Sequence, residues 1–367
     1  MIDLKQEEKV GNLSVFDDIA KHAHEQVVYC YDESTGLKAI IGIHNTILGP
    51  ALGGTRMWDY KSEKEAFVDV LRLSRGMTFK AAISGLNLGG GKAVIFGDAK
   101  KLKTEALLRR FGKFIESLNG KYVTAEDVNM TPDDMEYISM ETGYVTGLSE
   151  KMGGSGDPSP FTAYGVYMGM KACAKAAYGS DSLEGKKVAV QGVGHVGHYL
   201  VKHLSEEGAR VIVNDIYEDK IREVIRDFKV EVVDQDELYD SGMDIYAPCA
   251  LGATVNDDTL NRMHCDIIAG AANNQLEDEK RHGKMLMERG MIYAPDFMIN
   301  AGGLINVGMD YLGNYSRDRV FKKVEKIYNT VLDILQKSKE EKIPSQEAAI
   351  RLAVQRINDI GKVKLHL

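Results

Sequence analysis

The segment from Lys186 to Asp215, "KKVAVQGVGHVGHYLVKHLSEEGARVIVND", constrains the fold of this chain more than any other stretch. It begins with a short apolar strand, passes through a glycine turn into a helix that ends at Gly208, and closes with a second apolar strand. A strand, a helix and a strand in this order make a βαβ unit, whose strands run parallel in one sheet. The second half of the chain is therefore predicted to contain a parallel sheet.

Four further apolar segments extend this pattern, and polar helical segments alternate with them. Such alternation predicts a parallel sheet of the Rossmann type, covered by helices on both faces. The first half of the chain also mixes strand and helix patterns, so we predict an α/β protein with a second α/β domain there. The four downstream strand segments are residues 230–233, 244–248, 265–271 and 291–295.

A stretch rich in Gly, Ser and Pro, "KMGGSGDPSPFTAYG", separates the two halves. Ser159 is expected to be the N-cap of a helix that has Pro160 at its first position and runs to about Tyr178. We therefore expect one domain at 1–150 and a second at 151–334, with C-terminal helices at about 335–367 packing back on the first. Apolar residues at helical spacing indicate core or subunit packing for these helices; they are Val320, Val324, Ile327, Val331 and Ile334.

Composition excludes several classes of protein. The 367 residues carry a net charge of -8, so no basic surface for nucleic acid is expected. No apolar run reaches the roughly 18 residues of a membrane helix, and residues 1–10 lack the apolar core of a signal peptide, so we expect a cytoplasmic protein without membrane contact. The cysteines show no C-x-x-C spacing, which argues against disulfides and structural zinc; they are Cys30, Cys173, Cys249 and Cys265.

The glycine turn of the βαβ unit predicts a dinucleotide site. Gly192, Gly194 and Gly197 follow a strand and open a helix, with His195 and Val196 between them. Glycine permits the tight turn and the close approach of backbone amides, and a helix N-terminus attracts a pyrophosphate. The alternative is a turn with a purely structural role.

Asp215 supplies the second feature of such a site. It lies 18 residues beyond Gly197, at the end of the second strand, where a carboxylate binds the ribose 2′-hydroxyl of NAD. His195 and His198 could suggest a metal pair, but neutral histidines at the start and surface of a helix explain them better. No metal is expected.

A second glycine-rich stretch, "GLNLGGGKAV" (85–94), places three glycines before Lys92. A phosphate loop of the form G-x-x-x-x-G-K-[ST] is excluded, because Leu86 stands at the first glycine position and Ala93 at the hydroxyl position. The remaining alternatives are an ordinary turn with a solvated lysine and a functional lysine.

Four upstream motifs decide between these alternatives: "GPALGGTRMW", "GMTFKAA", "LGGGKAV" and "TAEDVN", followed by "GGSGDPSP". Their order and distances resemble the amino-acid dehydrogenases that deaminate glutamate, leucine, phenylalanine and valine, and most of all the leucine branch. The resemblance covers about residues 30–315. It implies a substrate and oligomerisation domain, a Rossmann-type NAD domain and a homo-oligomer, with an octamer as one arrangement. The implied reaction is NAD-dependent deamination of L-leucine and other branched-chain L-amino acids to 2-oxo acids and ammonia.

The resemblance also implies three polar roles. Lys80 is expected to bind the substrate α-carboxylate, Lys92 to act as the base that activates water, and Asp127 to exchange protons with the amine. A lysine is a base near neutral pH only if burial or a nearby cation lowers its pKa. We expect Lys80 to be that cation and the glycines to let the substrate approach closely.

The segment "DVNMTPDD" around Asp127 could suggest a calcium loop, since oxygen-bearing side chains alternate along it. Such a loop needs glycine at its sixth position and glutamate at its twelfth, where this chain has Pro132 and Ile138. Calcium is therefore not expected. Asn129 replaces a glycine that is common in the family.

An apolar pocket is expected to set the side-chain preference. The glutamate branch has a lysine where this chain has Leu52, and a buried carboxylate without a cation is costly, so glutamate is disfavoured. Leu304 stands where several leucine enzymes have a smaller valine. The remaining expected substrate contacts are Gly53, Met77, Ala125 and Val307, and a further cofactor contact is Asn274.

Three other functions stay open at this stage. Phenylalanine and valine dehydrogenases share the same motifs. A 2-hydroxy-acid dehydrogenase would need a histidine base and a substrate-binding arginine, where the upstream motifs offer lysines. A non-catalytic NAD-binding regulator would not need the paired lysines.

Overall fold

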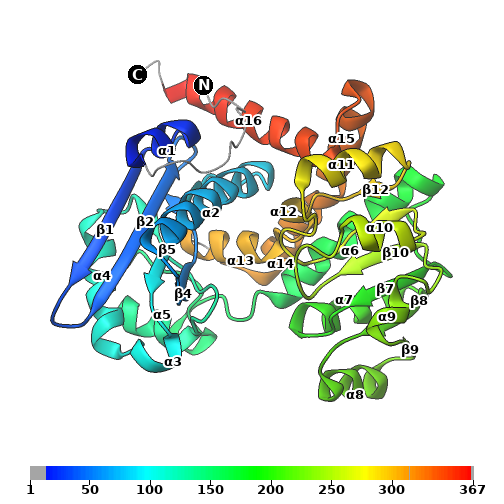
Figure 1. Ribbon diagram of the computed structural model, residues 1–367, viewed down its shortest axis with the longest axis horizontal. Helices are drawn as coiled ribbons and strands as arrows, with labels where there is room; N and C mark the ends of the chain where they lie inside the picture. Colours follow the sequence, from blue (N-terminus) through cyan, green and yellow to red (C-terminus); the bar gives the residue numbers. More distant parts are fainter. Residues whose placement is uncertain (1–13, 314, 365–367) are drawn as a thin grey trace. The chain divides into compact units, whose positions relative to one another are not determined.

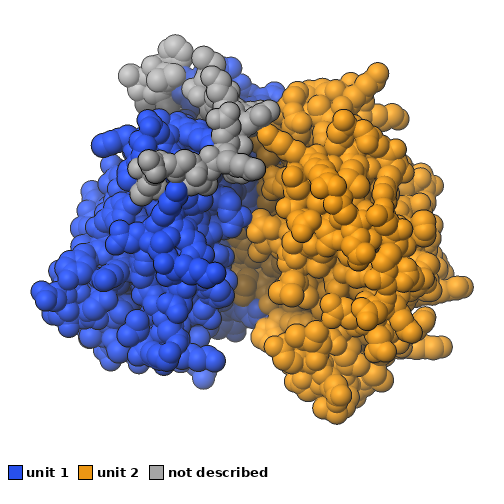
Figure 2. Space-filling model, in the orientation of Figure 1, with its two compact units in different colours: residues 1–157, 307–315, 353–367 blue, residues 158–306, 316–352 orange. Residues whose placement is uncertain are grey.

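The computed structural model describes residues 14–313 and 315–364, and the chain divides into two compact units (Figure 2). The expectation about a signal peptide concerned residues 1–10, which lie outside this described part. Unit 1 contains residues 1–157, 307–315 and 353–367, and unit 2 contains residues 158–306 and 316–352.

Unit 1 is built on a six-stranded mixed sheet with the order β1-β2-β5-β3-β6, and β4 pairs with β5 (Figure 1). The pairs β1/β2 and β2/β5 are antiparallel, and β3 and β4 run parallel to β5. The strands are β1 (Gln26–Asp32), β2 (Leu37–Asn45), β3 (Ala51–Leu52), β4 (Thr55–Trp58), β5 (Gly89–Phe96) and β6 (Tyr122–Val123).

Alternation along β5 distributes its side chains between two apolar clusters. Ala93 and Ile95 pack in a cluster with residues of α4 and α5, whereas Val94 packs with Phe67 and Val70 of α2. The strand is therefore buried on both faces. The helices of unit 1 are α1 (Val15–His22), α2 (Glu63–Ile83), α3 (Ala99–Leu102), α4 (Glu105–Ser117) and α5 (Pro132–Ser139).

The three glycines before Lys92 form the first residues of β5. A Cβ on Gly89 would lie 2.0 Å from the carbonyl oxygen of Asn45, and one on Gly90 would lie 2.1 Å from the backbone nitrogen of Thr78. A Cβ on Gly91 would meet the Tyr122 ring at 2.7 Å. Close packing thus explains why these positions carry no side chain, and the expectation that the glycines let substrate approach closely stays a prediction. They allow β5 to pack closely against other parts of unit 1.

Unit 2 contains a six-stranded, fully parallel sheet with the order β12-β11-β10-β7-β8-β9. β7, the first strand of this sheet in the sequence, lies in the middle: β8 and β9 follow on one side, and β10, β11 and β12 follow on the other. This is the strand order of the Rossmann fold. The prediction of a Rossmann-type parallel sheet is confirmed. Its strands are β7 (Lys187–Gln191), β8 (Arg210–Asn214), β9 (Glu231–Val232), β10 (Ile245–Pro248), β11 (Ile267–Ile268) and β12 (Ile292–Tyr293).

Helices of unit 2 alternate with these strands. α6 starts at Ser159 and ends at the predicted Tyr178, but its N-cap is Pro158, one residue before the predicted Ser159. α7 carries the glycine turn at its N-terminus. The short helix η1 (Glu150–Met152) precedes these helices in the sequence and belongs to unit 1. The helices of unit 2 up to α12 are α6 (Ser159–Tyr178), α7 (His195–Glu206), α8 (Glu218–Asp227), α9 (Gln235–Leu238), α10 (Asp257–Arg262), α11 (Glu279–Glu288) and α12 (Asp296–Ile299).

The C-terminal helices divide differently from the sequence expectation for residues 335–367. α14 (Arg317–Val324) and α15 (Lys326–Glu341) belong to unit 2, because their apolar stripe is buried there against α6. α16 (Ser345–Lys364) begins in unit 2, and its residues from 353 onward belong to unit 1. α13 (Gly302–Tyr311) likewise contains residues of both units.

Two further sequence expectations concern cysteines and membranes. All four cysteines are free, and Cys30 and Cys173 are buried. Of the helices formed by residues 14–313 and 315–364, none combines the length and apolar character needed to span a bilayer.

Candidate active site

Lys92 and Asp127, the two predicted catalytic residues, lie together in unit 1. Lys92 is on β5, opposite Gly42 of β2, and is only 5% exposed. Asp127 lies in the turn that follows β6, where the Met130 amide donates to the Asp127 carbonyl. Gly54 lets this turn approach, since a Cβ there would lie 2.9 Å from the Cβ of Asp127.

The two side chains form an ion pair that includes a third residue. The Lys92 Nζ lies 2.8 Å from the Asp127 Oδ2, and the Arg56 Nε lies 2.9 Å from the same oxygen. The Asp127 side chain is 25% exposed and that of Arg56 is 23% exposed, so the pair is largely shielded from water. Sequence analysis missed Arg56, although it stands in the motif "GPALGGTRMW".

Burial and neighbouring charges together shift the pKa values of Lys92 and Asp127. Burial lowers the pKa of Lys92, and the positive charge of Arg56 lowers it further, against the opposing effect of Asp127. Burial alone would raise the pKa of Asp127, but Lys92 and Arg56 outweigh it and hold that pKa below its usual value. Arg56 is thus a cation that lowers the pKa of Lys92 and that was not predicted from the sequence, and the expected effect of Lys80 on Lys92 stays a prediction.

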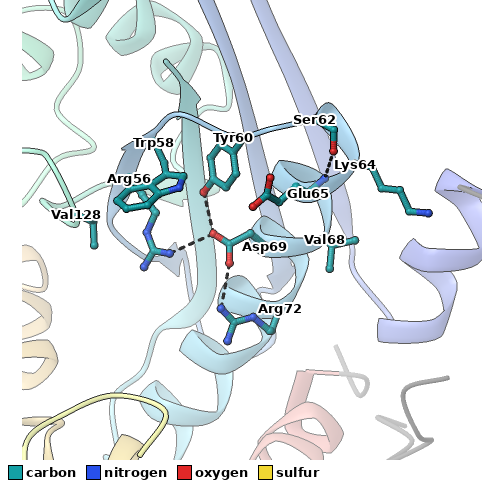
Figure 3. Close-up of a pocket in the computed structure, with 10 residues that line it drawn as sticks. All are labelled: Arg56, Trp58, Tyr60, Ser62, Lys64, Glu65, Val68, Asp69, Arg72 and Val128. Atoms are coloured by element: carbon teal, nitrogen blue, oxygen red, sulfur yellow. Dashed lines mark hydrogen bonds and ion pairs between the residues drawn. The ribbon is translucent and has the colours of Figure 1, made fainter. Parts of the chain in front are cut away.

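Asp69 of α2 fixes the other end of the Arg56 guanidinium. Arg56 Nη1 donates to Asp69 Oδ2 at 3.2 Å, Tyr60 donates its hydroxyl to the same oxygen at 2.8 Å, and Arg72 donates to Oδ1 at 3.0 Å (Figure 3). These residues line a pocket of 740 Å³ that also contains the exposed Trp58.

The predicted substrate contacts of unit 1 occupy three places. Lys80 and Met77 lie on α2, near its C-terminal end, and both are partly buried. Leu52 is the last residue of β3 and Ala125 follows β6, and both are buried. Gly53 serves the packing, because a Cβ there would lie 1.7 Å from the carbonyl oxygen of Gly91.

The two predicted contacts on α13 are one helical turn apart. Val307 is partly buried, and its carbonyl accepts a hydrogen bond from the Thr146 hydroxyl at 3.0 Å. Leu304 is buried and belongs to the part of α13 that lies in unit 2.

The glycine turn after β7 fits a dinucleotide phosphate. Gly192 has a φ of 95°, and a Cβ on Gly197 would lie 2.1 Å from the Gly192 carbonyl oxygen. A Cβ on Gly194 would meet nothing within 4 Å, so open space lies at the start of α7. The N-cap of α7 is Gly194, which has no side chain to bond the first amides of the helix, and His195 and Val196 are the first helical residues. A helix start whose N-cap residue leaves its amides uncapped and that faces open space suits a phosphate.

Asp215 lies beside this turn and already holds it. Its Oδ2 accepts a hydrogen bond from the Val193 amide at 2.7 Å, and its Oδ1 accepts one from the Tyr217 amide at 2.9 Å. Asn274 lies after β11 in the left-handed region, with a φ of 52°, and its carbonyl accepts from the Ala253 amide at 2.7 Å. These residues share unit 2, the unit that carries the predicted nucleotide site.

A metal was not expected from the sequence. Within residues 14–313 and 315–364, the His, Cys, Asp and Glu side chains do not gather in any group of three that could hold a metal ion. The site in unit 1 is thus an arrangement of lysine, arginine and carboxylate groups. It can move a proton to or from a buried amine.

Comparisons with known proteins identify the family. A family model for the Glu/Leu/Phe/Val dehydrogenase dimerisation domain matches residues 24–144, and one for Glutamate/Leucine/Phenylalanine/Valine dehydrogenase matches residues 153–364. A leucine dehydrogenase of Thermoactinomyces intermedius is 56% identical over 96% of this chain and 96% of its own. An L-tryptophan dehydrogenase of Nostoc punctiforme is 48% identical over 95% of this chain and 98% of its own.

A solved structure agrees with these matches. The crystal structure of L-tryptophan dehydrogenase from Nostoc punctiforme aligns with a TM-score of 0.85 and 46% identity, over 95% of this chain and 99% of that one. Together with the two family models, this similarity over nearly the full length confirms the family that the motifs suggested. The chain belongs to the glutamate, leucine, phenylalanine and valine dehydrogenase family and is an amino-acid dehydrogenase.

Proposed function

We propose that the protein catalyses the reversible, NAD-dependent oxidative deamination of L-leucine and other branched-chain L-amino acids to 2-oxo acids and ammonia. The buried Lys92–Asp127 pair carries this proposal, because the reaction needs an amine that is neutral near physiological pH. The leucine dehydrogenase that is 56% identical to this chain supports leucine as a substrate.

In the proposed mechanism, Lys92 accepts a proton from water while the water oxygen attacks the imine carbon of the oxidised substrate. Asp127, which first takes a proton from the substrate ammonium, returns it to the nitrogen of the resulting carbinolamine. The C–N bond then breaks as the C=O bond of the 2-oxo acid forms, and the hydroxyl proton leaves with ammonia as ammonium. Lys80, at the C-terminal end of α2, binds the α-carboxylate and so orients Cα. The charge of each group fits its proposed role. Lys92 is a buried amine with a lowered pKa, and Asp127 is a carboxylate whose pKa is held below its usual value. Lys80 offers an ammonium group to the α-carboxylate.

NAD, when bound, supplies the acceptor for the hydride of Cα. The proposed contacts are the amides at the start of α7 for the pyrophosphate, with Gly194 leaving room, and Asp215 for the ribose. A carboxylate repels a 2′-phosphate by about 4 kcal/mol per charge pair at about 4 Å and an effective dielectric near 20, before screening. We therefore propose NAD rather than NADP.

The apolar character of the pocket candidates supports a branched aliphatic substrate. Leu52, Ala125 and Leu304 are buried, and Val307 is partly buried. A glutamate side chain would need a cation in such surroundings. Activity is therefore proposed to fall from branched aliphatic to aromatic to acidic amino acids.

A second candidate is an aromatic amino acid. The L-tryptophan dehydrogenase of Nostoc punctiforme is 48% identical to this chain over nearly the full length, which favours this class over an acidic substrate. The two classes differ in the volume of the side chain rather than in its polarity.

The test is an assay of NADH and NADPH formation with each cofactor and a panel of leucine, valine, isoleucine, phenylalanine, tryptophan, glutamate and lactate. The proposal expects the highest kcat/KM with a branched aliphatic amino acid and NAD. A higher value with tryptophan would select the second candidate, and turnover of glutamate comparable to leucine would refute the apolar pocket. The reverse reaction with 2-oxo acids and ammonia should show the same order.

We also propose that the protein is a homo-oligomer and that its assembly is an octamer. The family model that matches residues 24–144 describes a dimerisation domain, which supports self-association. Light scattering combined with size-exclusion chromatography measures the mass directly. A monomeric mass at micromolar concentration would contradict the proposal.

A further inference from the structure

Arg56 has no role in the proposed reaction, yet it touches the carboxylate that does. Its Nε donates to Asp127 Oδ2 at 2.9 Å, and Lys92 Nζ lies 2.8 Å from the same oxygen. One carboxylate oxygen thus serves two cations, of which only the lysine can lose its charge in a protein.

Strand geometry brings Arg56 to this oxygen. Arg56 of β4 is paired with Val94 of β5, and residues that pair across a sheet point to the same face. Lys92 is two residues before Val94 and therefore also points to that face. α2 covers this face, because Val94 packs against Phe67 of that helix.

α2 also supplies the anchor for Arg56. The Asp69 carboxylate accepts hydrogen bonds from Arg56, Tyr60 and Arg72 (Figure 3). With the bond to Asp127, the guanidinium of Arg56 is held between two carboxylates. A planar guanidinium with donors at both ends is restricted in orientation when both ends are bound. Its Nε is therefore directed at Asp127.

We propose that Arg56, held by Asp69, is a positioning residue of the deamination: it fixes the Asp127 carboxylate and remains its cationic partner when Lys92 is neutral. This inference rests on the proposed function of Lys92 and Asp127. It adds a residue that contacts neither water nor substrate in the proposed mechanism and acts through Asp127.

The proposed role follows from the proton cycle. When Lys92 is neutral, its amine still donates one N–H to Asp127 Oδ2, and its lone pair accepts the proton of the attacking water. During this step Asp127 would face a neutral amine alone if Arg56 were absent. The permanent charge of Arg56 keeps the carboxylate ionised and favours the neutral form of Lys92.

Arg56→Gln tests the proposal with leucine and NAD as substrates. We expect kcat to fall about 10²-fold with little change in KM, because the acid–base groups lose their alignment. The pH at which deamination activity rises should move upward, since a cation that favours neutral Lys92 is lost. Arg109→Gln is the matched control, because Arg109 pairs with Glu105 and Glu141 on α4 and after α5. It should retain the wild-type rate and profile.

Arg56→Lys separates charge from geometry. It keeps the positive charge but has no planar fork, so the pH profile should stay near that of the wild type while kcat remains reduced about 10-fold. A wild-type kcat in Arg56→Lys would overturn the proposal. An unchanged pH profile in Arg56→Gln would also overturn it, because a loss of kcat without a pH shift would show that Arg56 has a merely structural role.

A second readout does not depend on turnover. Competitive acetylation with a trace of acetic anhydride, followed by peptide mass mapping, measures the pH at which Lys92 becomes reactive. That pH should be higher in Arg56→Gln than in the wild type, and equal values would contradict the inference. If leucine is not a substrate but the shift is present, the proposed function fails and the coupling of Arg56 to Lys92 stands. Circular dichroism confirms folding, and Arg56→Lys carries the test if Arg56→Gln does not fold.

Discussion

The charge of Lys92 results from opposing influences at the scale of single residues. Burial and Arg56 lower its pKa, whereas Asp127 raises it. A lysine of this kind is expected to act as a base, which an exposed lysine at neutral pH cannot do.

Lys92→Ala is expected to abolish deamination while leaving NAD affinity nearly unchanged, because Lys92 lies in unit 1 and the glycine turn in unit 2. Steady-state rates and the fluorescence of bound NADH measure the two quantities. Lys101→Ala is the control, since Lys101 is an exposed partner of Asp98. Turnover at the wild-type rate in Lys92→Ala would remove Lys92 from the mechanism.

Asp215 holds the glycine turn through the Val193 amide and is proposed to bind the ribose, and substitutions can separate these two tasks. Its Oδ2 holds the Val193 amide, so Asp215→Ala should weaken both cofactors, and NAD more than NADP. Asp215→Asn retains an oxygen for the amide but loses the charge, so it should narrow the NAD to NADP ratio of kcat/KM with a smaller total loss. Replacing Ile216 by a basic residue is expected to be needed to reverse the preference from NAD to NADP. Equal losses of kcat/KM in Asp215→Ala and Asp215→Asn would show that the contact with the Val193 amide is unimportant.

At the scale of elements, the apolar patterns predicted most of the fold. The βαβ unit has the predicted order, and the predicted strand segments 230–233, 244–248, 265–271 and 291–295 contain β9, β10, β11 and β12. β3 and β4 escaped prediction because glycines interrupt the segment that contains them, "GPALGGTRMW", so that it has no apolar run. α13 escaped because it begins with two glycines, which favour helix poorly.

Site residues that stand in a motif and have a role in the expected reaction were predicted. Residues that join the site only through a tertiary contact were missed. Lys92 and Asp127 were expected, and the structure pairs them. Arg56 lies 71 residues from Asp127 in the sequence, so no local pattern joins them. The packing role of Gly89 and Gly90 was not predicted, because a sequence does not show the backbone atoms of Asn45 and Thr78 that exclude a side chain.

The turn after β6 depends on Asn129, where the family commonly has glycine. Asn129 has a φ of 61°, and its Nδ2 donates to the Met57 carbonyl at 3.0 Å. Asparagine tolerates the left-handed region better than most residues, so the substitution suits the turn and adds a bond to β4. The departure from glycine therefore does not disturb this loop.

Asn129→Gly should lower the stability by about 1 kcal/mol through the lost hydrogen bond, and Asn129→Ala by roughly 1 to 2 kcal/mol more through backbone strain. Both should lower kcat, because Asp127 belongs to the same turn. Calorimetry and steady-state rates measure the effects. Equal stability of the Gly and Ala variants would show that the left-handed backbone is not required.

Two buried histidines between α1, β2 and α2 make the stability of unit 1 dependent on pH. Burial lowers the pKa of His24 to about 4 and that of His44 to about 3, from 6.5. His44 Nδ1 lies 2.8 Å from the Thr78 hydroxyl, and His24 Nε2 lies 2.8 Å from that of Ser74. Below pH 6.5 the unfolded chain binds protons that the folded chain does not, so stability falls as the pH falls.

At about pH 5 each histidine should remove about 2 kcal/mol of stability relative to about pH 7.5. His44→Asn should therefore show a smaller drop in Tm between these two pH values than the wild type, as scanning calorimetry would reveal. The carboxylates titrate alike in both proteins and cancel in the comparison. Identical drops would mean that His44 does not carry the effect.

At the scale of the whole molecule, unit 1 is completed by chain that returns after unit 2. Residues from 353 onward belong to unit 1, and Arg356 of α16 bonds the carbonyls of Ala82 and Leu86 and the Asn87 side chain at 2.8 to 3.1 Å. Burial lowers the pKa of Arg356. The last helix thus secures the C-terminal end of α2, two residues beyond Lys80.

Arg356→Ala is expected to lower Tm, by roughly 2 to 4 °C for each kcal/mol lost, because two carbonyls lose a charged donor. It should also raise KM for the amino acid if the end of α2 loosens around Lys80. Arg351→Ala is the control on the same helix, since Arg351 pairs with Glu341 and Glu347 at the surface. A Tm loss no larger than that of the control would refute the anchoring role.

The discontinuity of unit 1 has a consequence for the nascent chain. A ribosome adds about 5 to 20 residues per second, so residues 353–364 emerge on the order of ten seconds or more after residue 157. During this interval the end of α2 lacks the hydrogen bonds from Arg356. Unit 2, apart from its final segment, can fold first, and α2 with its lysine reaches its final packing only when translation is almost complete.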